Sequence, residues 1–286
     1  MKNLIGTVVY EQSNYFTESY FKALQKIEEE FYLLLLCENY SSYQKITSFI
    51  PNIKKNIIVE VSKNKKNYIN LRDELLNEAL KIEKWQNIYL LDFDDEISQN
   101  AIKIHSKVLD NFSISVGNMR LIDEKSNLLG PCFFDSNRIK SKITSSNQIV
   151  FKNIFGMTNT AFKRKTLIHK PKLKNNTIKA YDWWLFTKLL DNNIEAGVSN
   201  SYVTDYRVSQ HSLLGWGAPY NLKRFKKELS IIHNHFSSLE ANRYRKIAIA
   251  YLNKANNLIN NEIKLCKTFC NHVWYYDFFK NLSHSS

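Results

Sequence analysis

The strongest constraint on the fold is an alternation of short apolar runs with amphipathic segments over the first 93 residues. Apolar runs of strand length are found at residues 5–10, 31–37, 56–61 and 87–93. Segments with apolar side chains at helical spacing lie between them, at residues 15–30, 41–50 and 68–84. Apolar strands that alternate with helices are typical of a parallel sheet covered on both faces. The first part of the chain is therefore predicted to be α/β.

Beyond residue 100 the pattern becomes mixed. Strands are expected at 112–123 and within 149–167 and 201–217, and residues 180–193 have the apolar spacing of a helix. From residue 219 the chain is helical in pattern and rich in Lys and Arg. We predict a mixed, mostly parallel sheet flanked by helices in residues 1–217, in two halves, 1–100 and 101–217. A basic helical region is expected to follow at 218–286.

The chain is basic, with a formal net charge of +13. Such a surface favours polyanionic partners, which include nucleic acid, anionic lipid and phosphorylated substrates. Nucleic acid is the least supported of these, because we find no zinc finger, no aromatic RNA-binding motif and no helix-turn-helix. No run of 18 apolar residues occurs, and the N-terminus lacks the pattern of a secretory signal. We therefore expect a cytoplasmic protein.

Polar side chains follow three of the apolar strands at their carboxyl ends, where ligands of parallel sheets bind. They are Tyr10, Glu11, Glu38 and an acidic cluster of Asp92, Asp94 and Asp95. Crowded carboxylates repel one another, so the cluster needs compensation. A divalent cation would supply it and would let the same edge hold a diphosphate. The alternative is a solvated acidic turn in which an Asp or Ser98 caps the next helix.

Five segments, which occur in the same order as in the family, resemble the inverting GT-A glycosyltransferases of family 2. "DFDD" at 92–95 resembles their Asp-x-Asp motif, and "NYINLRDELLNEAL" at 67–80 resembles the segment before it, with Arg72 at the Arg position. "IFGMTNTAFKRKTL" at 154–167 resembles their acceptor-side segment. "AYDWWLF" and "DYRVSQHSLLG", at 180–186 and 205–215, resemble the ending of rhamnosyltransferase-like members. The resemblance covers residues 4–217 and implies a Rossmann-like GT-A fold for nucleotide-diphospho-sugar transfer.

The resemblance also implies roles for individual residues. Asp182 falls at the general base of the family; its alternative is a helix N-cap with Trp183 and Trp184 in the core. Donor-binding roles are implied for Tyr10, Glu11, Glu38, Arg72, Asp92 and Arg207. A Mn²⁺ or Mg²⁺ site is implied at Asp92, Asp94, Asp95 and His211. For Arg72 and His211 the alternatives are an ordinary helix charge and a structural histidine.

The function implied is metal-dependent, inverting transfer of a sugar from a nucleotide-diphosphate sugar, with UDP or dTDP as the nucleotide. The acceptor would be a saccharide or lipid-linked saccharide in the synthesis of bacterial capsule, O-antigen or lipooligosaccharide. A metal-dependent nucleotidyltransferase is the enzymatic alternative, but such enzymes usually have a Gly-rich phosphate loop that this sequence lacks. The basic helices after residue 217 either lie on the anionic inner face of the plasma membrane or pack across the catalytic domain.

Overall fold

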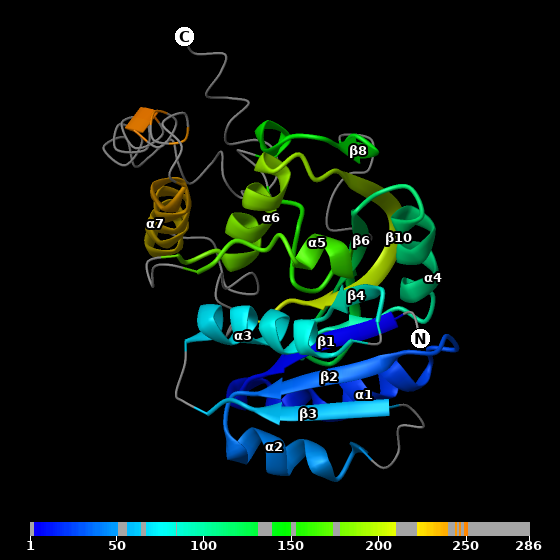
Figure 1. Cartoon of the computed structure of the whole chain (residues 1–286). Coiled ribbons are helices and arrows are strands. Elements are labelled where there is room, and N and C mark those ends of the chain that lie inside the picture. The colour runs from blue at the N-terminus through cyan, green and yellow to red at the C-terminus, as the bar shows by residue number, and fades with distance from the viewer. Residues whose placement is uncertain are drawn as a thin grey trace.

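The computed structural model describes residues 3–50, 56–63, 67–83, 85–130, 139–149, 153–173, 178–209, 222–239, 244, 246 and 249–250. These residues form a ten-stranded sheet flanked by helices (Figure 1). The predicted fold class, a mixed α/β sheet covered by helices, is confirmed. Among the described residues, none of the helices combines the length and the apolarity that crossing a bilayer requires.

Four parallel strands form the N-terminal part of the sheet, in the order β3, β2, β1, β4. They span Asn3–Val9 (β1), Tyr32–Cys37 (β2), Asn56–Val61 (β3) and Asn87–Leu90 (β4). The connections contain a 3-10 helix and three α-helices, at Glu11–Phe16 (η1), Thr17–Gln25 (α1), Tyr40–Thr47 (α2) and Tyr68–Lys81 (α3). The strands run in the same direction, so their carboxyl ends meet at one edge, as the sequence pattern predicts.

An antiparallel strand divides the sheet. This strand, β9 (Thr160–Lys163), lies between β4 and β6 (Ile114–Ile122), and β6 pairs in parallel with β10 (Ala196–Arg207). Three short strands extend the second half, at Glu96–Ile97 (β5), Leu128–Gly130 (β7) and Lys142–Ile143 (β8). Its helices span Ala101–Leu109 (α4), Arg164–Leu167 (α5) and Tyr181–Asp191 (α6), with a 3-10 turn at Ser146–Gln148 (η4).

The alternation of side chains along β1 divides the core into two layers. Leu4 and Val8 pack in one layer with α3 and α6, whereas Ile5 and Val9 pack in the other with α1 and α4. All four side chains are at most 3% exposed. The sheet is therefore covered on both faces, and polar groups at its carboxyl edge are positioned by strands that cannot shift register without exposing this core.

The first part of the basic C-terminal region packs on the rest of the protein. Helix α7 (Leu222–Ser238) lies beside α6 (Figure 1), and the ring of His235 stacks on Trp183 with 4.0 Å between ring centroids. Ile232 and Phe236 are buried in the same core layer as α6. Helix α7 therefore packs across the rest of the protein, which is the alternative that we gave to membrane binding. Residues 251–286 lie outside the described residues.

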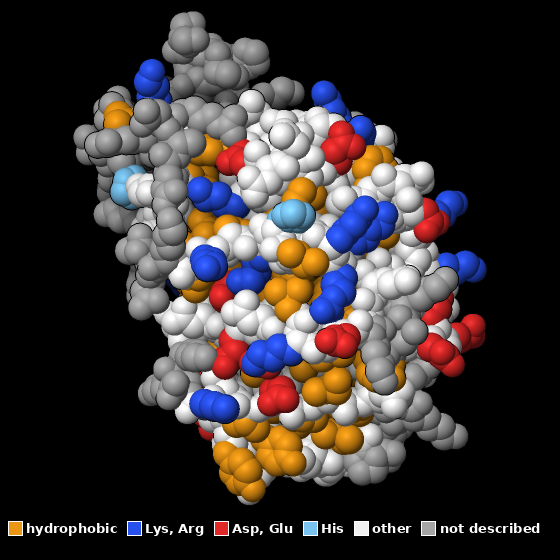
Figure 2. Space-filling view, viewed as in Figure 1, with side chains coloured by type: hydrophobic (Ala, Val, Ile, Leu, Met, Phe, Trp, Pro, Cys, Tyr) orange, Lys and Arg blue, Asp and Glu red, His pale blue; other side chains and the backbone are white. Residues whose placement is uncertain are grey.

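The face shown in Figure 2 carries Lys and Arg side chains in small groups between acidic and apolar ones. The described part of this face therefore presents no continuous basic stripe of the kind that tracks a nucleic-acid backbone.

Two buried histidines are expected to make the fold sensitive to acid. Burial lowers the pKa of His105 and of His235 from 6.5 to about 3. Between those values the unfolded chain binds protons that the folded chain excludes, so stability is full above pH 6.5 and is lost as the pH falls. We expect the free energy of unfolding, measured with urea, to fall by roughly 2 kcal/mol per histidine from about pH 7.5 to about pH 5.

A pair of variants checks this expectation. His235→Phe keeps an aromatic ring against Trp183 and should reduce the pH dependence, whereas His169→Phe, at an exposed position, should not. An identical pH dependence in His235→Phe and the unmodified protein would contradict the assignment.

Candidate active site

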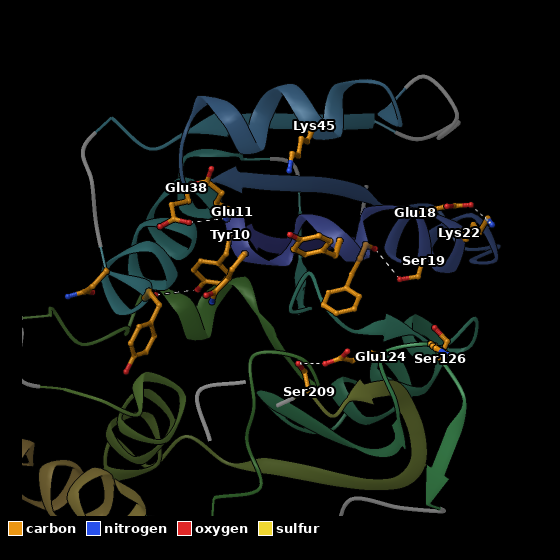
Figure 3. Close-up of a pocket in the computed structure, with 16 residues that line it drawn as sticks. Tyr10, Glu11, Glu18, Ser19, Lys22, Glu38, Lys45, Glu124, Ser126 and Ser209 are labelled. Carbon is orange, nitrogen blue, oxygen red and sulfur yellow. Dashed lines mark hydrogen bonds and ion pairs between the residues drawn. The ribbon is translucent and has the colours of Figure 1, made fainter. Parts of the chain in front are cut away.

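The carboxyl ends of β1 and β2 bring three of the predicted donor-binding residues together. The register places Val9 beside Cys37, so the residues after each strand are neighbours. The backbone N–H of Glu11 donates to the Glu38 carboxylate at 3.0 Å, and the Asn39 side-chain amide donates to the Glu11 carboxylate at 3.0 Å. Figure 3 shows Glu11 and Glu38 side by side above Tyr10.

These side chains line a cleft of about 1490 Å³ along the carboxyl edge of the sheet (Figure 3). Asn67 and Tyr68, at the start of α3, lie on the side of Tyr10. Across the cleft from α1 is the turn after β6, where the Ser209 hydroxyl donates to the Glu124 carboxylate at 2.8 Å. The cleft is large enough to hold a nucleotide sugar.

Arg72 lies beside the acidic cluster rather than on an exposed helix face. Its Nη2 donates to both carboxylate oxygens of Asp92, at 2.9 and 3.0 Å. Burial disfavours the charge of Arg72, but the nearby Asp92 and Tyr10 outweigh it and raise the pKa of the guanidinium well above its ordinary value. Arg72 therefore stays charged, and it compensates one of the crowded aspartates.

The other two aspartates of the cluster are poorly compensated. Burial, together with the charge of Asp92, raises the pKa of Asp94 from 3.8 to about 6. Burial and the charges of Asp94 and Asp92 raise the pKa of Asp95 well above its ordinary value. Asp95 is 1% exposed, and its Oδ1 accepts the backbone N–H of Arg207 at 2.7 Å. The bond from Arg207 and a side-chain hydrogen bond with Thr158 oppose the rise of its pKa without cancelling it. Both carboxyl groups therefore hold their protons more tightly than an exposed aspartate does.

Asp182 lies in the first turn of α6, within electrostatic range of Arg72 and Asp92. Burial raises the pKa of its carboxyl group, and the charge of Arg72 opposes that rise. Ala180 rather than Asp182 occupies the N-cap, although the Asp182 carboxylate does accept the backbone N–H of Trp183 at 2.8 Å. Both tryptophans, Trp183 and Trp184, belong to the core, being 1% and 4% exposed.

Arg207 is directed into the protein, not into the cleft. The residue is 2% exposed, and all five of its guanidinium N–H groups have acceptors among the described residues. Those acceptors are the carbonyl oxygens of Asp94 and Asp123, the Glu96 carboxylate, and the hydroxyls of Ser19 and Ser126. Arg207 therefore has no free N–H group for the predicted contact with a diphosphate. Its hydrogen bonds instead hold in place the loop that carries the acidic cluster, which we call the acidic loop.

The remaining predicted ligand, His211, lies outside the described residues. Among the described residues, no group of three or more His, Cys, Asp and Glu side chains is arranged to hold a metal ion. The cluster nevertheless fits a hard divalent cation that takes one or two carboxylates and completes its shell with water and phosphate oxygens. Two observations support the fit: the charge of Asp94, which the described residues do not fully compensate, and the nearly complete burial of the Asp95 carboxyl group beside it.

The sequence analysis did not identify the residues that link α3, which carries Arg72, to the start of α6, which carries Asp182. Tyr68 lines the cleft, and its hydroxyl donates to the carbonyl oxygen of Lys179 at 2.6 Å, just before α6. Asp73, next to Arg72, bonds the hydroxyl of Tyr181, next to Asp182. Both belong to segments that the resemblance covers, but nothing in their spacing signals a contact between residues more than a hundred positions apart.

No family model matches the chain, and no curated protein matches its sequence. Solved structures do. The chain is similar to residues 1–349 of S. aureus TarS, with a TM-score of 0.59 at 15% identity over 92% of this chain and 74% of that one. The GT-A fold predicted from the motifs is confirmed. The same TarS fragment in complex with UDP-GlcNAc gives a TM-score of 0.60 at 16% identity, over 88% of this chain and 72% of that one.

A mannosyltransferase also has a similar structure. It is the mannosyltransferase PcManGT from Pyrobaculum calidifontis, in complex with GDP-Man and Mn²⁺, with a TM-score of 0.56 at 11% identity over 99% of this chain and 83% of that one. At identities this low the likeness establishes the fold. What the site of this chain does is argued from its own residues.

Proposed function

We propose that this chain is a metal-dependent, inverting glycosyltransferase that uses a nucleotide-diphosphate sugar. One observation carries the proposal: four side chains converge beside a cleft at the carboxyl edge of a GT-A sheet. They are the paired Arg72 and Asp92, the poorly compensated Asp94, and the half-buried Asp182. Two solved structures with this fold support the proposal: TarS holds UDP-GlcNAc, and the mannosyltransferase PcManGT holds GDP-Man with Mn²⁺.

The donor would occupy the cleft. We propose that Tyr10, Glu11 and Glu38 contact the nucleoside, since they line the cleft where β1 and β2 end. UDP and dTDP are the nucleotides that we expect. Arg72, which Asp92 holds in place, supplies positive charge toward the diphosphate. Arg207 acts indirectly in this scheme, because its contacts hold the backbone of Asp94 and the carboxylate of Asp95.

Mn²⁺ or Mg²⁺ would be held by Asp94 together with Asp92 or Asp95. When bound, such an ion stabilises the negative charge that the departing diphosphate acquires. His211 is proposed as a further ligand by the resemblance alone.

Asp182 is proposed as the general base. As an acceptor hydroxyl oxygen forms its bond to the anomeric carbon, the bond from that carbon to the diphosphate breaks and its electron pair leaves with the diphosphate. The proton of the hydroxyl passes to the Asp182 carboxylate. Attack from the face opposite the diphosphate inverts the anomeric configuration. The raised pKa of Asp182 makes it a better proton acceptor than an exposed aspartate.

The proposed acceptor is a saccharide or lipid-linked saccharide of a bacterial capsule, O-antigen or lipooligosaccharide. A protein that acts on a lipid-linked acceptor at the inner face of the plasma membrane would bind that surface peripherally, and the net charge of +13 favours this. The full chain should therefore float with vesicles containing anionic lipid and not with purely zwitterionic vesicles. Equal flotation with both would contradict the electrostatic attraction.

A thermal-shift panel tests the function. UDP-, dTDP-, GDP- and CMP-sugars are compared with and without Mn²⁺, beside a short duplex DNA. Stabilisation that requires both Mn²⁺ and one nucleotide class supports the proposal, because a ligand that binds only the folded state raises the melting temperature. Stabilisation by the duplex alone would favour nucleic-acid binding instead.

Replacing Asp94 should abolish the dependence of donor binding on the metal. Asp94→Asn keeps the shape of the side chain but removes the charge that a hard cation requires. We expect the Mn²⁺-dependent part of the thermal shift to disappear, while the melting temperature without ligand stays the same or rises, because a repelling charge is lost.

Asp110→Asn is the matched control, since Asp110 is an exposed residue at the end of α4, outside the cleft. A Mn²⁺-dependent shift in Asp94→Asn as large as in the unmodified protein would exclude Asp94 as the metal ligand.

A further inference from the structure

Two helices meet at the candidate site through pairs of consecutive residues. Helix α3 carries Arg72 and Asp73, and α6 begins with Tyr181 and Asp182. Neighbouring residues on a helix point about 100° apart, so each pair can direct one side chain toward the acidic cluster and the other toward the facing helix. Arg72 and Asp182 interact electrostatically, and Asp73 bonds directly to Tyr181.

The bond between Asp73 and Tyr181 is largely shielded from solvent, and a second donor shares its acceptor oxygen. The Tyr181 hydroxyl donates to Oδ1 of Asp73 at 2.8 Å, and the Lys170 ammonium donates to the same oxygen. Tyr181 is 0% exposed, and the Asp73 and Lys170 side chains are 14% and 7% exposed. Burial and the Asp73 charge raise the pKa of Tyr181 well above its ordinary value, so the phenol remains a protonated donor.

Within the first turn of α6, the Asp182 carboxylate accepts the backbone N–H of Trp183 at 2.8 Å. The N-cap residue, Ala180, adds no side-chain oxygen acceptor to this turn. Instead α3 holds this turn at two points: the Tyr68 hydroxyl bonds the carbonyl oxygen of Lys179 at 2.6 Å, and Asp73 bonds Tyr181. Asp182 follows directly.

We infer that Asp73 is a positioning residue: through the Tyr181 hydroxyl it fixes the first turn of α6, so that the Asp182 carboxylate is held beside Arg72. The inference rests on the proposed function, in which Asp182 is the base. Its physical reason is that general-base catalysis depends on the position of the base, and a displacement of about 1 Å can cost on the order of 100-fold in rate. Lys170 balances the charge of Asp73 and restrains its carboxylate.

Tyr181→Phe tests the inference, since it removes the hydroxyl and keeps the ring. The assay is hydrolysis of UDP-GlcNAc with Mn²⁺ by the full chain, in which water takes the place of the acceptor. We expect turnover to fall roughly 10- to 100-fold, with the Kd for UDP-GlcNAc unchanged. Turnover equal to that of the unmodified protein would overturn the inference.

Tyr89→Phe is the matched control. It also removes a buried hydroxyl, which bonds Asn3 at 3.0 Å and Ser106 at 2.8 Å in the opposite core layer. We expect it to lower stability and to leave turnover unchanged. An equal loss of turnover in Tyr89→Phe would show that any buried hydroxyl has this effect, and the positioning role would be wrong.

A double variant separates a positioning role from a general structural one. If Asp73 and Tyr181 act through Asp182, then Tyr181→Phe should cause no further loss of turnover in an Asp182→Asn background. An equal fold-loss in both backgrounds would overturn the inference. If Asp182→Asn itself keeps full turnover, the proposed base is wrong, and this failure is distinguishable from that of Tyr181→Phe alone.

Discussion

Asp182→Asn is expected to reduce sugar transfer roughly 100- to 10,000-fold, which is the usual contribution of a positioned general base. The amide has nearly the shape of the carboxylate but cannot take the proton of an acceptor hydroxyl. The backbone N–H of Trp183 still finds an oxygen acceptor on Asn, so the start of α6 should remain intact. Donor binding is expected to persist, because Tyr10, Glu11 and Glu38 at the cleft are unchanged.

Two measurements decide this prediction. Turnover is measured by release of nucleoside diphosphate, and donor affinity is measured by calorimetry on the same preparation. Asp205→Asn serves as the control, since that carboxylate is paired with Arg120 and does not line the cleft. Retained turnover in Asp182→Asn would remove Asp182 from the mechanism, and loss of donor binding would assign it to the donor site instead.

The dependence of turnover on pH in the unmodified enzyme should also reveal the titration of Asp182. A base works only when it is deprotonated, so turnover should fall as the pH drops through the pKa of Asp182. Burial raises that pKa above 3.8. The acid limb should therefore lie above the pH at which an exposed aspartate titrates, and it should be absent from the residual activity of Asp182→Asn.

The sheet and its ligand-binding edge could be predicted because the evidence for them is local. Apolar runs at 31–37 and 56–61 match β2 and β3, and the helical spacing at 68–84 matches α3. Once these elements are parallel, the residues after β1, β2 and β4 must share one edge. Helix α4 entered the sequence analysis only as the helix that an Asp or Ser98 could cap, without bounds, although Ala101, Ile102, His105 and Leu109 are buried at helical spacing and could have defined it.

The partners of individual side chains could not be predicted, because they depend on contacts between distant segments. Arg72 lies 20 positions from Asp92, and only the packing of α3 against the sheet shows that the two are paired. The insertion of β9 between β4 and β6 is likewise set by long-range pairing. Arg207 is the clearest case: a motif places an Arg near the site, but only the fold shows whether its side chain faces ligand or interior.

Arg207→Met should cause the largest loss of stability among single substitutions near the site. Methionine has a similar reach but no donors, so it would leave the Glu96 carboxylate and the carbonyl oxygens of Asp94 and Asp123 without their partner. Breaking a buried ion pair from one side typically costs about 3–5 kcal/mol. The contact of the guanidinium with the Phe16 ring, 4.7 Å from its centroid, would also be lost.

Arg120→Met provides a matched comparison, because Arg120 also bonds an aspartate through two nitrogens, at 2.6 and 2.7 Å, but its side chain is 43% exposed. An exposed pair contributes about 0.2–1 kcal/mol, so urea denaturation should show a much smaller loss for Arg120→Met. Adding Glu96→Gln to Arg207→Met should recover part of the stability, since it removes the uncompensated charge. Equal losses in Arg207→Met and Arg120→Met would mean that the acidic loop is held by other contacts, and Mn²⁺-dependent donor binding would then survive the Arg207 substitution.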